Sequence, residues 1–128
     1  SDAAFLLAKK CIPNLYTVSD SIGVSGLKDG LYKFAGKEIE KKLGRVFQKK
    51  TNTLAGSVVT MYQTFLNLID INCSLTEAVA LTSYNASKYL NEPSIGQIKE
   101  NKKANFLVLD KELKLKSIYL HGQLIIKN

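Results

Sequence analysis

Asp20 is the residue of this sequence whose surroundings best fit chemistry. It follows the stretch Leu15–Ser19, which has strand character, and it precedes a loop of serines and glycines. An aspartate in this position can close a turn by hydrogen-bonding its own backbone. It can also be presented at the end of a buried strand as a general acid or base. The residues alone leave both interpretations open.

Other reactive side chains are few. His121 is the single histidine, and it falls at a predicted turn, which favours an exposed turn residue over a catalyst. Cys11 and Cys73 lack the spacing of metal ligands, so we expect buried thiols. A zinc site takes three or four ligands, and this chain does not supply a persuasive set.

The stretch Leu54–Ala55–Gly56 is a second candidate, this time for binding. It leads into a predicted helix whose first backbone N–H groups lack partners, and small residues let a ligand approach such a helix end. An ordinary helix cap at Ser57 is the simpler alternative. The nearby "GVSGLKDG" lacks the patterns of the common phosphate-binding loops.

Charge and hydropathy exclude several classes of protein. The formal net charge is +7, but Arg45 is the single arginine and the lysines are scattered in pairs, which favours a solvated lysine surface over a nucleic-acid interface. No apolar run approaches the roughly 20 residues that span a bilayer. The N-terminal stretch also lacks the positive charge of a signal peptide. We therefore expect a cytoplasmic protein that binds neither nucleic acid nor membrane.

The elements that must position these residues alternate between helix and strand, which indicates an α/β protein. Apolar spacing and capping signals predict helices over Ala3–Lys10, from Ser57 to about Ile69, and from Ser74 to about Leu90. Glycine turns at Asp29-Gly30, Ala35-Gly36 and Leu43-Gly44 predict short antiparallel strands between the first two helices. The tail predicts further strands over Phe106–Leu109, Leu113–Lys116, Ile118–Leu120 and Leu124–Ile126.

Several of these stretches, taken in order, resemble the N-acetylglucosamine-6-phosphate deacetylases. "YTVSDSIGVSGLKDGLYKFAGKEI" is similar to a segment of that family with an acid before a "DG" hairpin, and "TLAGSVVTM" resembles its "TLAGS" segment. "SLTEAVALTSYNASKYLN" and "GQIKENKKANFLVLDKELKL" resemble a tail common to amidohydrolases in general. The resemblance covers essentially all 128 residues.

The resemblance implies a fold and a role for each candidate residue. The expected fold is the C-terminal part of a metal-dependent (β/α)₈ barrel, residues 1–93 with a β-hairpin insertion, followed by strands of a small β-sandwich, residues 94–128. Asp20 would act as general base on a metal-bound water and then as general acid toward the departing amine. Leu54, Ala55 and Gly56 match the loop that contacts substrate.

The implied reaction is hydrolysis of the N-acetyl group of N-acetylglucosamine 6-phosphate, which gives glucosamine 6-phosphate and acetate. The full-length enzyme would carry a divalent metal, zinc or iron, and would form a homodimer. The metal-binding Glu and His residues and most phosphate contacts would lie upstream. Asp20 is thus the one candidate metal ligand here, and we expect this piece alone to bind no metal and to be inactive. The alternatives are an amidohydrolase acting on another cyclic amide or N-acyl sugar, and a non-enzymatic lysine-rich binding module.

Overall fold

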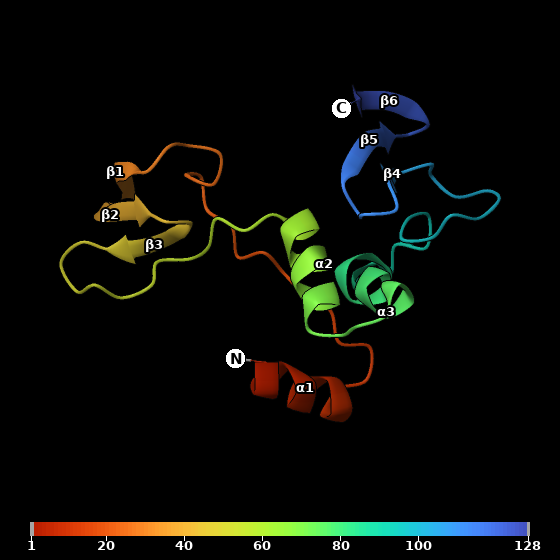
Figure 1. The fold of residues 1–128 in the computed structure, drawn as a ribbon, viewed down its shortest axis with the longest axis horizontal. Coiled ribbons are helices and arrows are strands. Elements are labelled where there is room, and N and C mark those ends of the chain that lie inside the picture. Colours follow the sequence, from red (N-terminus) through yellow and green to blue (C-terminus); the bar gives the residue numbers. More distant parts are fainter. Residues whose placement is uncertain (1, 128) are drawn as a thin grey trace. The chain divides into compact units, whose positions relative to one another are not determined.

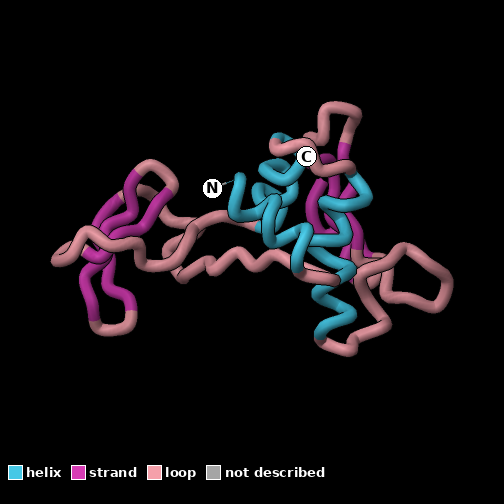
Figure 2. The backbone as a smooth tube through the Cα atoms, turned by 90° about the horizontal axis from the view of Figure 1, so that it is seen from below, coloured by secondary structure: helices cyan, strands magenta, loops and turns pink. Residues whose placement is uncertain are grey.

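The computed structural model describes residues 2–127, and they form two compact units. One unit joins the residues up to Thr17 with those from Leu68 onward, and the other is the segment Val18–Asn67. Each unit carries its own three-stranded sheet, drawn as arrows in Figure 1 and in magenta in Figure 2. The described residues are thus a small α/β structure with two small sheets.

The sheet of Val18–Asn67 is an antiparallel meander in the order β1-β2-β3 (Figure 1). Its strands are β1 Gly30–Phe34, β2 Lys37–Lys42 and β3 Arg45–Gln48. The turns at Ala35-Gly36 and Leu43-Gly44 have two residues, all with positive φ, which matches the right-handed twist of the flanking strands. The strands and the turns expected at Ala35-Gly36 and Leu43-Gly44 are therefore confirmed, whereas the turn expected at Asp29-Gly30 is not, because Gly30 is the first residue of β1.

The core of this unit lies on one face of the meander. Val24, Ile39 and Val46 are buried, and Ile39 and Val46 are the largest fully buried side chains of the described residues. Because side chains alternate along a strand, Lys41 shares the inward face of β2 with Ile39, and it is buried as well. The meander thus covers the loop that contains Val24.

Helix α2, Met61–Asp70, begins later than expected. Thr60 acts as its cap, since the Thr60 Oγ1 accepts a hydrogen bond from the Gln63 N–H at 3.1 Å. Ser57 instead accepts the Val59 N–H at 3.0 Å and lies in extended chain. The prediction that Ser57 caps this helix is wrong, because the backbone of Ser57 is engaged in pairing with Asp20 and Ile22.

The other unit contains α1 Asp2–Cys11, followed later in the chain by α3 Leu75–Val79, a π-helical turn η1 Ala80–Tyr84 and α4 Asn85–Tyr89. The predicted capping box is present, because Ser74 accepts the Glu77 N–H while Glu77 accepts the Ser74 N–H. The apolar spacing predicts that Leu75, Ala78, Val79 and Thr82 share one face of this helix. Ala78 is buried, as is Leu81, but Leu75 and Val79 are about half exposed.

The stretch Leu15–Ser19, predicted as a strand, is extended but carries no strand ladder among the described residues. Its contacts are single hydrogen bonds: the Thr17 N–H donates to the Leu81 carbonyl at 2.8 Å, and the Asn85 amide donates to the Leu15 carbonyl at 2.7 Å. The strand prediction is therefore wrong for this structure. An extended segment becomes a strand only where a neighbouring strand pairs with it.

The tail sheet has the order β4-β5-β6, with β4 Phe106–Leu109, β5 Leu115–Leu120 and β6 Gln123–Lys127. The Phe106 and Tyr119 rings stack across β4 and β5 with centroids 4.7 Å apart. The strand expected from Leu113 begins at Leu115, because Leu113 has a φ of 61° within a turn. The strands predicted for the tail are otherwise confirmed.

The two cysteines differ in environment. Cys73 is buried, as expected, but Cys11 is exposed. The expectation for Cys11 is wrong because α1 buries none of its described residues. Within residues 2–127, no helix combines the length and the apolar character needed to cross a membrane.

Glu77 links the capping box to α1, and this link makes a pH-dependent prediction. The Lys9 ammonium, followed by the Ser74 N–H and hydroxyl, lowers the pKa of Glu77 from 4.5 to about 2. A carboxylate with a lowered pKa stabilises the folded state above its unfolded pKa and loses that stabilisation as the pH falls through the folded pKa. We expect Glu77→Gln to lower the thermal midpoint at neutral pH, and the difference to shrink between pH 4.5 and about 2.

Circular dichroism melts across that pH range measure the effect. Glu40→Gln, at an exposed position of β2, is the matched control and should show no comparable pH-dependent difference. A Glu77→Gln difference that stays constant from neutral to acid pH would contradict this account of the ion pair.

Candidate active site

Asp20 lies at a sharp change of backbone direction in the unit Val18–Asn67. Its φ is +48°, a conformation that aspartate tolerates better than most residues. The Ser21 N–H donates to the Ser19 Oγ at 3.2 Å and closes the bend around Asp20. The Asp20 side chain is exposed, and no hydrogen bond or ion pair within residues 2–127 engages its carboxylate.

The backbone on either side of Asp20 is paired with the segment around Ser57. The Ser57 N–H donates to the Asp20 carbonyl at 2.8 Å, and the Ile22 N–H donates to the Ser57 carbonyl at 3.0 Å. Ser21 and Ser57 thereby form an isolated parallel bridge. The two candidate stretches predicted from the sequence, Asp20 and Leu54–Gly56, are thus brought together by main-chain hydrogen bonds.

Gly56 is required for this close approach. Its φ is +87°, and a Cβ built on it would lie 2.7 Å from the Ile22 Cγ2 and 3.3 Å from the Asp20 carbonyl oxygen. Any larger side chain would therefore be strained in its backbone and would press on the segment that follows Asp20. Glycine here sets the spacing between the carboxylate-bearing bend and the neighbouring loop.

Leu54 and Ala55 differ in their contacts: Ala55 is bonded to β3 and packs on the core, whereas Leu54 is exposed. The Ala55 N–H donates to the Val46 carbonyl at 2.9 Å and its side chain packs against the buried core, so it anchors the loop on β3. Leu54 is 68% exposed and is free to meet a ligand. The loop does not sit at a helix end, because α2 begins only at Met61. The helix-terminus prediction for Leu54–Gly56 is therefore wrong.

The donor set around Asp20 does not fit a metal centre by itself. Among residues 2–127, no three histidine, cysteine, aspartate or glutamate side chains lie where they could hold an ion together. A zinc site takes three or four such ligands, and Asp20 offers one carboxylate. The described residues can therefore contribute to a metal site only alongside ligands from elsewhere.

His121 occupies the turn between β5 and β6, as the sequence predicts. It has a φ of 51°, its side chain is exposed, and its backbone N–H donates to the Asn105 Oδ1 at 2.8 Å. The Gly122 N–H donates to the Ala104 carbonyl at 2.9 Å and completes the turn. These contacts explain His121 as a turn residue.

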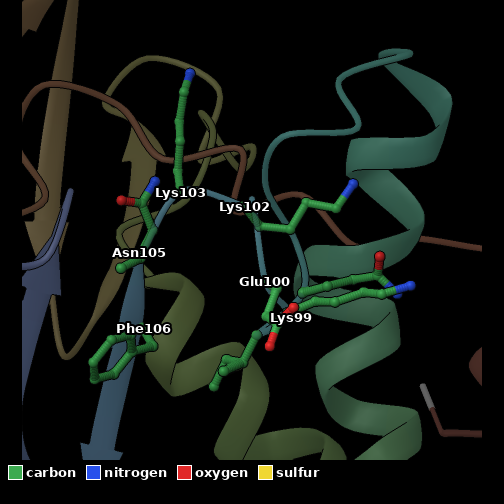
Figure 3. A pocket seen from close by; sticks show the side chains of 9 residues that line it. Lys99, Glu100, Lys102, Lys103, Asn105 and Phe106 are labelled. Carbon is green, nitrogen blue, oxygen red and sulfur yellow. The ribbon is translucent and has the colours of Figure 1, made fainter.

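A shallow hollow of about 220 Å³ lies beside the loop that leads into β4, and Figure 3 shows it from close by. Its lining includes Lys99, Lys102 and Lys103. The Lys102 ammonium donates to the Pro93 carbonyl at 2.6 Å, and the Lys103 side chain points away from Lys99 and Lys102 (Figure 3). Because these charges do not converge, the hollow lacks the geometry of an anion site.

The sequence does not predict the roles of two residues near Asp20, Ile22 and Lys41. Ile22 limits what can stand at position 56, and Lys41 donates from β2 into the loop that follows Asp20. The alternation in "KEIEKK" places Lys41 on the buried face with Ile39, which is the one signal that could have identified it. The carbonyl oxygens that Lys41 meets come from a loop without a periodic pattern.

Comparison with known proteins identifies similar chains. The sequence profile described as "Amidohydrolase family" matches residues 7–126. An N-acetylglucosamine-6-phosphate deacetylase of Bacillus subtilis is 38% identical over 77 residues, which cover 59% of this chain and 19% of that protein. A putative N-acetylgalactosamine-6-phosphate deacetylase of Escherichia coli is 27% identical over 109 residues, 84% of this chain and 65% of that protein.

The fold is similar to a solved structure over its whole length. The crystal structure of an N-acetylglucosamine-6-phosphate deacetylase from Thermotoga maritima matches with a TM-score of 0.90 and 28% sequence identity. The match covers 100% of this chain and 36% of the Thermotoga chain. This chain therefore spans less than two thirds of each of these proteins.

Proposed function

This chain belongs to the amidohydrolase family, and on that premise we propose that it is the C-terminal portion of an N-acetylglucosamine-6-phosphate deacetylase. The complete enzyme would hydrolyse the N-acetyl group of N-acetylglucosamine 6-phosphate to give glucosamine 6-phosphate and acetate. Residues 1–93 would then contribute to a (β/α)₈ barrel with a β-hairpin insertion, and residues 94–128 to a β-sandwich. The whole-length likeness to the Thermotoga deacetylase supports this assignment.

The observation that carries the proposal is the state of the Asp20 carboxylate. The Asp20 carboxylate is exposed and unpaired within residues 2–127, although its backbone is fixed by the Ser57 pairing and by the Ser19 bend. A surface aspartate that served only to close the turn would accept backbone hydrogen bonds with its own side chain. A rigid backbone that presents a free carboxylate is instead the arrangement expected of an acid–base group.

The reaction needs a group that moves one proton twice. As water adds to the acetyl carbonyl carbon, Asp20 accepts a proton from that water. When the carbon–nitrogen bond breaks, Asp20 returns the proton to the departing amine nitrogen. The products are the amine and acetic acid, which ionises to acetate by releasing the second proton of the water to solvent or to the amine, and the Asp20 carboxylate ends in its starting state.

The neighbouring loop would hold the sugar. Leu54 offers an exposed apolar side chain, while Ala55 anchors the loop to β3 and Gly56 keeps it close to Asp20. The main-chain bond between Ser57 and Asp20 keeps this loop and the carboxylate at a fixed separation. Both features support Leu54, Ala55 and Gly56 as substrate contacts.

The remaining parts of the enzyme would lie outside this chain. A divalent metal, zinc or iron, would be held mainly by ligands upstream, with Asp20 as the one candidate ligand described here; when bound, it would supply Lewis-acid activation of water and of the acetyl group. We further propose a cytoplasmic homodimer that binds neither nucleic acid nor membrane. Most of the phosphate contacts would also come from upstream residues.

A substrate panel on the complete enzyme tests the proposed function. Acetate release should be fastest from N-acetylglucosamine 6-phosphate and much slower from N-acetylglucosamine, which lacks the phosphate. N-Acetylgalactosamine 6-phosphate belongs in the panel because the Escherichia coli relative is named for that substrate. Faster acetate release from N-acetylgalactosamine 6-phosphate would identify that compound, and not N-acetylglucosamine 6-phosphate, as the substrate. Turnover of a cyclic amide alone would place the chain elsewhere in the amidohydrolase family.

A further inference from the structure

Lys41 is a buried lysine that pairs with no carboxylate of residues 2–127. Its side chain lies on the inward face of β2, and the residue is 8% exposed. None of the ion pairs in the part of the chain that the structure describes involves Lys41. Because a buried charge is costly unless it is paired or hydrogen-bonded, this lysine needs other partners.

Those partners are three backbone carbonyl oxygens of one loop. The Lys41 Nζ donates to the carbonyls of Val24 at 3.2 Å, Ser25 at 2.8 Å and Leu27 at 2.5 Å. An ammonium group has three N–H donors and no acceptor, so this set satisfies it completely. Three carbonyl dipoles that converge on one point would repel each other without a cation between them, and the ammonium therefore fixes the shape of the loop.

The same loop is also bonded to residues 57–58, which directly follow the candidate substrate loop Leu54–Gly56. The Ser25 hydroxyl donates to the Val58 carbonyl at 2.8 Å, and the Ile22 N–H donates to the Ser57 carbonyl at 3.0 Å. Asp20 lies two residues before Ile22 and accepts the Ser57 N–H. Lys41 and the segment 57–58 thus hold the residues that follow Asp20 between them.

We propose that Lys41 is a positioning residue of the active site. By gathering the carbonyls of Val24, Ser25 and Leu27, its ammonium holds the 20–27 segment against residues 57–58 and so fixes the Asp20 carboxylate relative to the Gly56 loop. The effect of Lys41 on catalysis rests on the proposed function, because Lys41 acts through Asp20. We call the three hydrogen bonds from Lys41 to the carbonyls of Val24, Ser25 and Leu27 the clamp. The clamp can be measured without any substrate.

The test uses two Lys41 variants of the complete enzyme with one matched control. Lys41→Met keeps the stem and removes the ammonium, Lys41→Ala opens the space for an added amine, and Lys42→Met removes an exposed lysine from the same strand. We expect Lys41→Met to lower kcat about tenfold while KM changes less than about threefold, since a small displacement of a catalytic group acts mainly on the chemical step. Lys42→Met should leave both constants unchanged.

Amide hydrogen exchange supplies the readout that does not depend on activity. The amides of Ile22, Ser25, Leu27 and Ser57 form hydrogen bonds within this segment or between it and Ser57, and they should exchange at least about fivefold faster in Lys41→Met. In Lys41→Ala, added ethylammonium should restore slow exchange and kcat, whereas tetramethylammonium, which has no N–H donors, should restore neither. This rescue separates loss of the clamp from general misfolding.

The outcomes separate the two proposals. Wild-type exchange and wild-type kcat in Lys41→Met would overturn the role of Lys41. Exchange that speeds up at these amides in an enzyme that does not deacetylate amino-sugar phosphates would sustain the clamp and overturn the proposed function. Fast exchange with kcat unchanged would overturn the positioning role, and failure of ethylammonium to slow the exchange in Lys41→Ala would overturn the clamp.

Discussion

Asp20→Asn in the complete enzyme should lower kcat for deacetylation on the order of 10³-fold, within the range that a general acid–base group contributes. The amide of asparagine has nearly the same shape as the carboxylate but cannot take a proton from water at neutral pH. Asparagine also tolerates the positive φ of position 20 as readily as aspartate, so the bend and its pairing with Ser57 should persist. We therefore expect the loss in kcat, with KM nearly unchanged.

Asp29→Asn is the matched control for this variant. The Asp29 Oδ2 accepts the Leu43 N–H at 2.8 Å, and the asparagine side-chain oxygen can still accept that bond. Both variants remove one negative charge from the same unit, so a general electrostatic effect would appear in both. Comparable kcat values for Asp20→Asn and Asp29→Asn, both near wild type, would remove Asp20 from the chemistry.

Gly56→Ala should have the second largest effect, because it combines two penalties. The left-handed backbone costs an L-residue about 1–2 kcal/mol, and forcing a methyl group against the Ile22 side chain adds about 1–3 kcal/mol. The methyl would push the loop away from the Asp20 segment, whose carbonyl oxygen lies 3.3 Å from the added Cβ. We expect kcat/KM to fall by about a hundredfold, together with lower stability in urea unfolding.

Gly36→Ala separates the two penalties. Gly36 has a similar φ of +75°, but a Cβ there would meet nothing within 4 Å, so it should show the backbone cost without the crowding. Adding Ile22→Ala to Gly56→Ala removes the Cγ2 and should recover part of the lost kcat/KM. Equal effects of Gly56→Ala and Gly36→Ala on stability and rate would show that crowding at Ile22 is unimportant.

Local signals predicted much of the secondary structure. Two-residue turns at Ala35-Gly36 and Leu43-Gly44 define β1–β3, and the reciprocal bonds of Ser74 and Glu77 begin α3 where expected. Each of these features depends on residues within a few positions of one another, so the sequence pattern contains the whole cause. The sequence does not predict the pairing of the Asp20 segment with Ser57; the family resemblance implies only that Asp20 and Leu54–Gly56 belong to one active site.

The errors arose where distant residues decide the structure. Leu15–Ser19 has strand character but no strand pairing among residues 2–127. Leu75 and Val79 lie in α3 with the buried Ala78 but are about half exposed themselves. Ser57 is diverted from capping by its bonds to the Asp20 segment. The burial of Lys41 likewise depends on carbonyls 14 to 17 residues away.

A crystal structure of the complete Asp20→Asn enzyme with N-acetylglucosamine 6-phosphate tests the central assignment most directly. The account predicts an intact substrate whose acetamide lies within hydrogen-bond reach, about 3.5 Å or less, of the side chain at position 20, with Leu54 against the sugar. A substrate bound with its acetamide far from position 20, and with that side chain in open solvent, would contradict it.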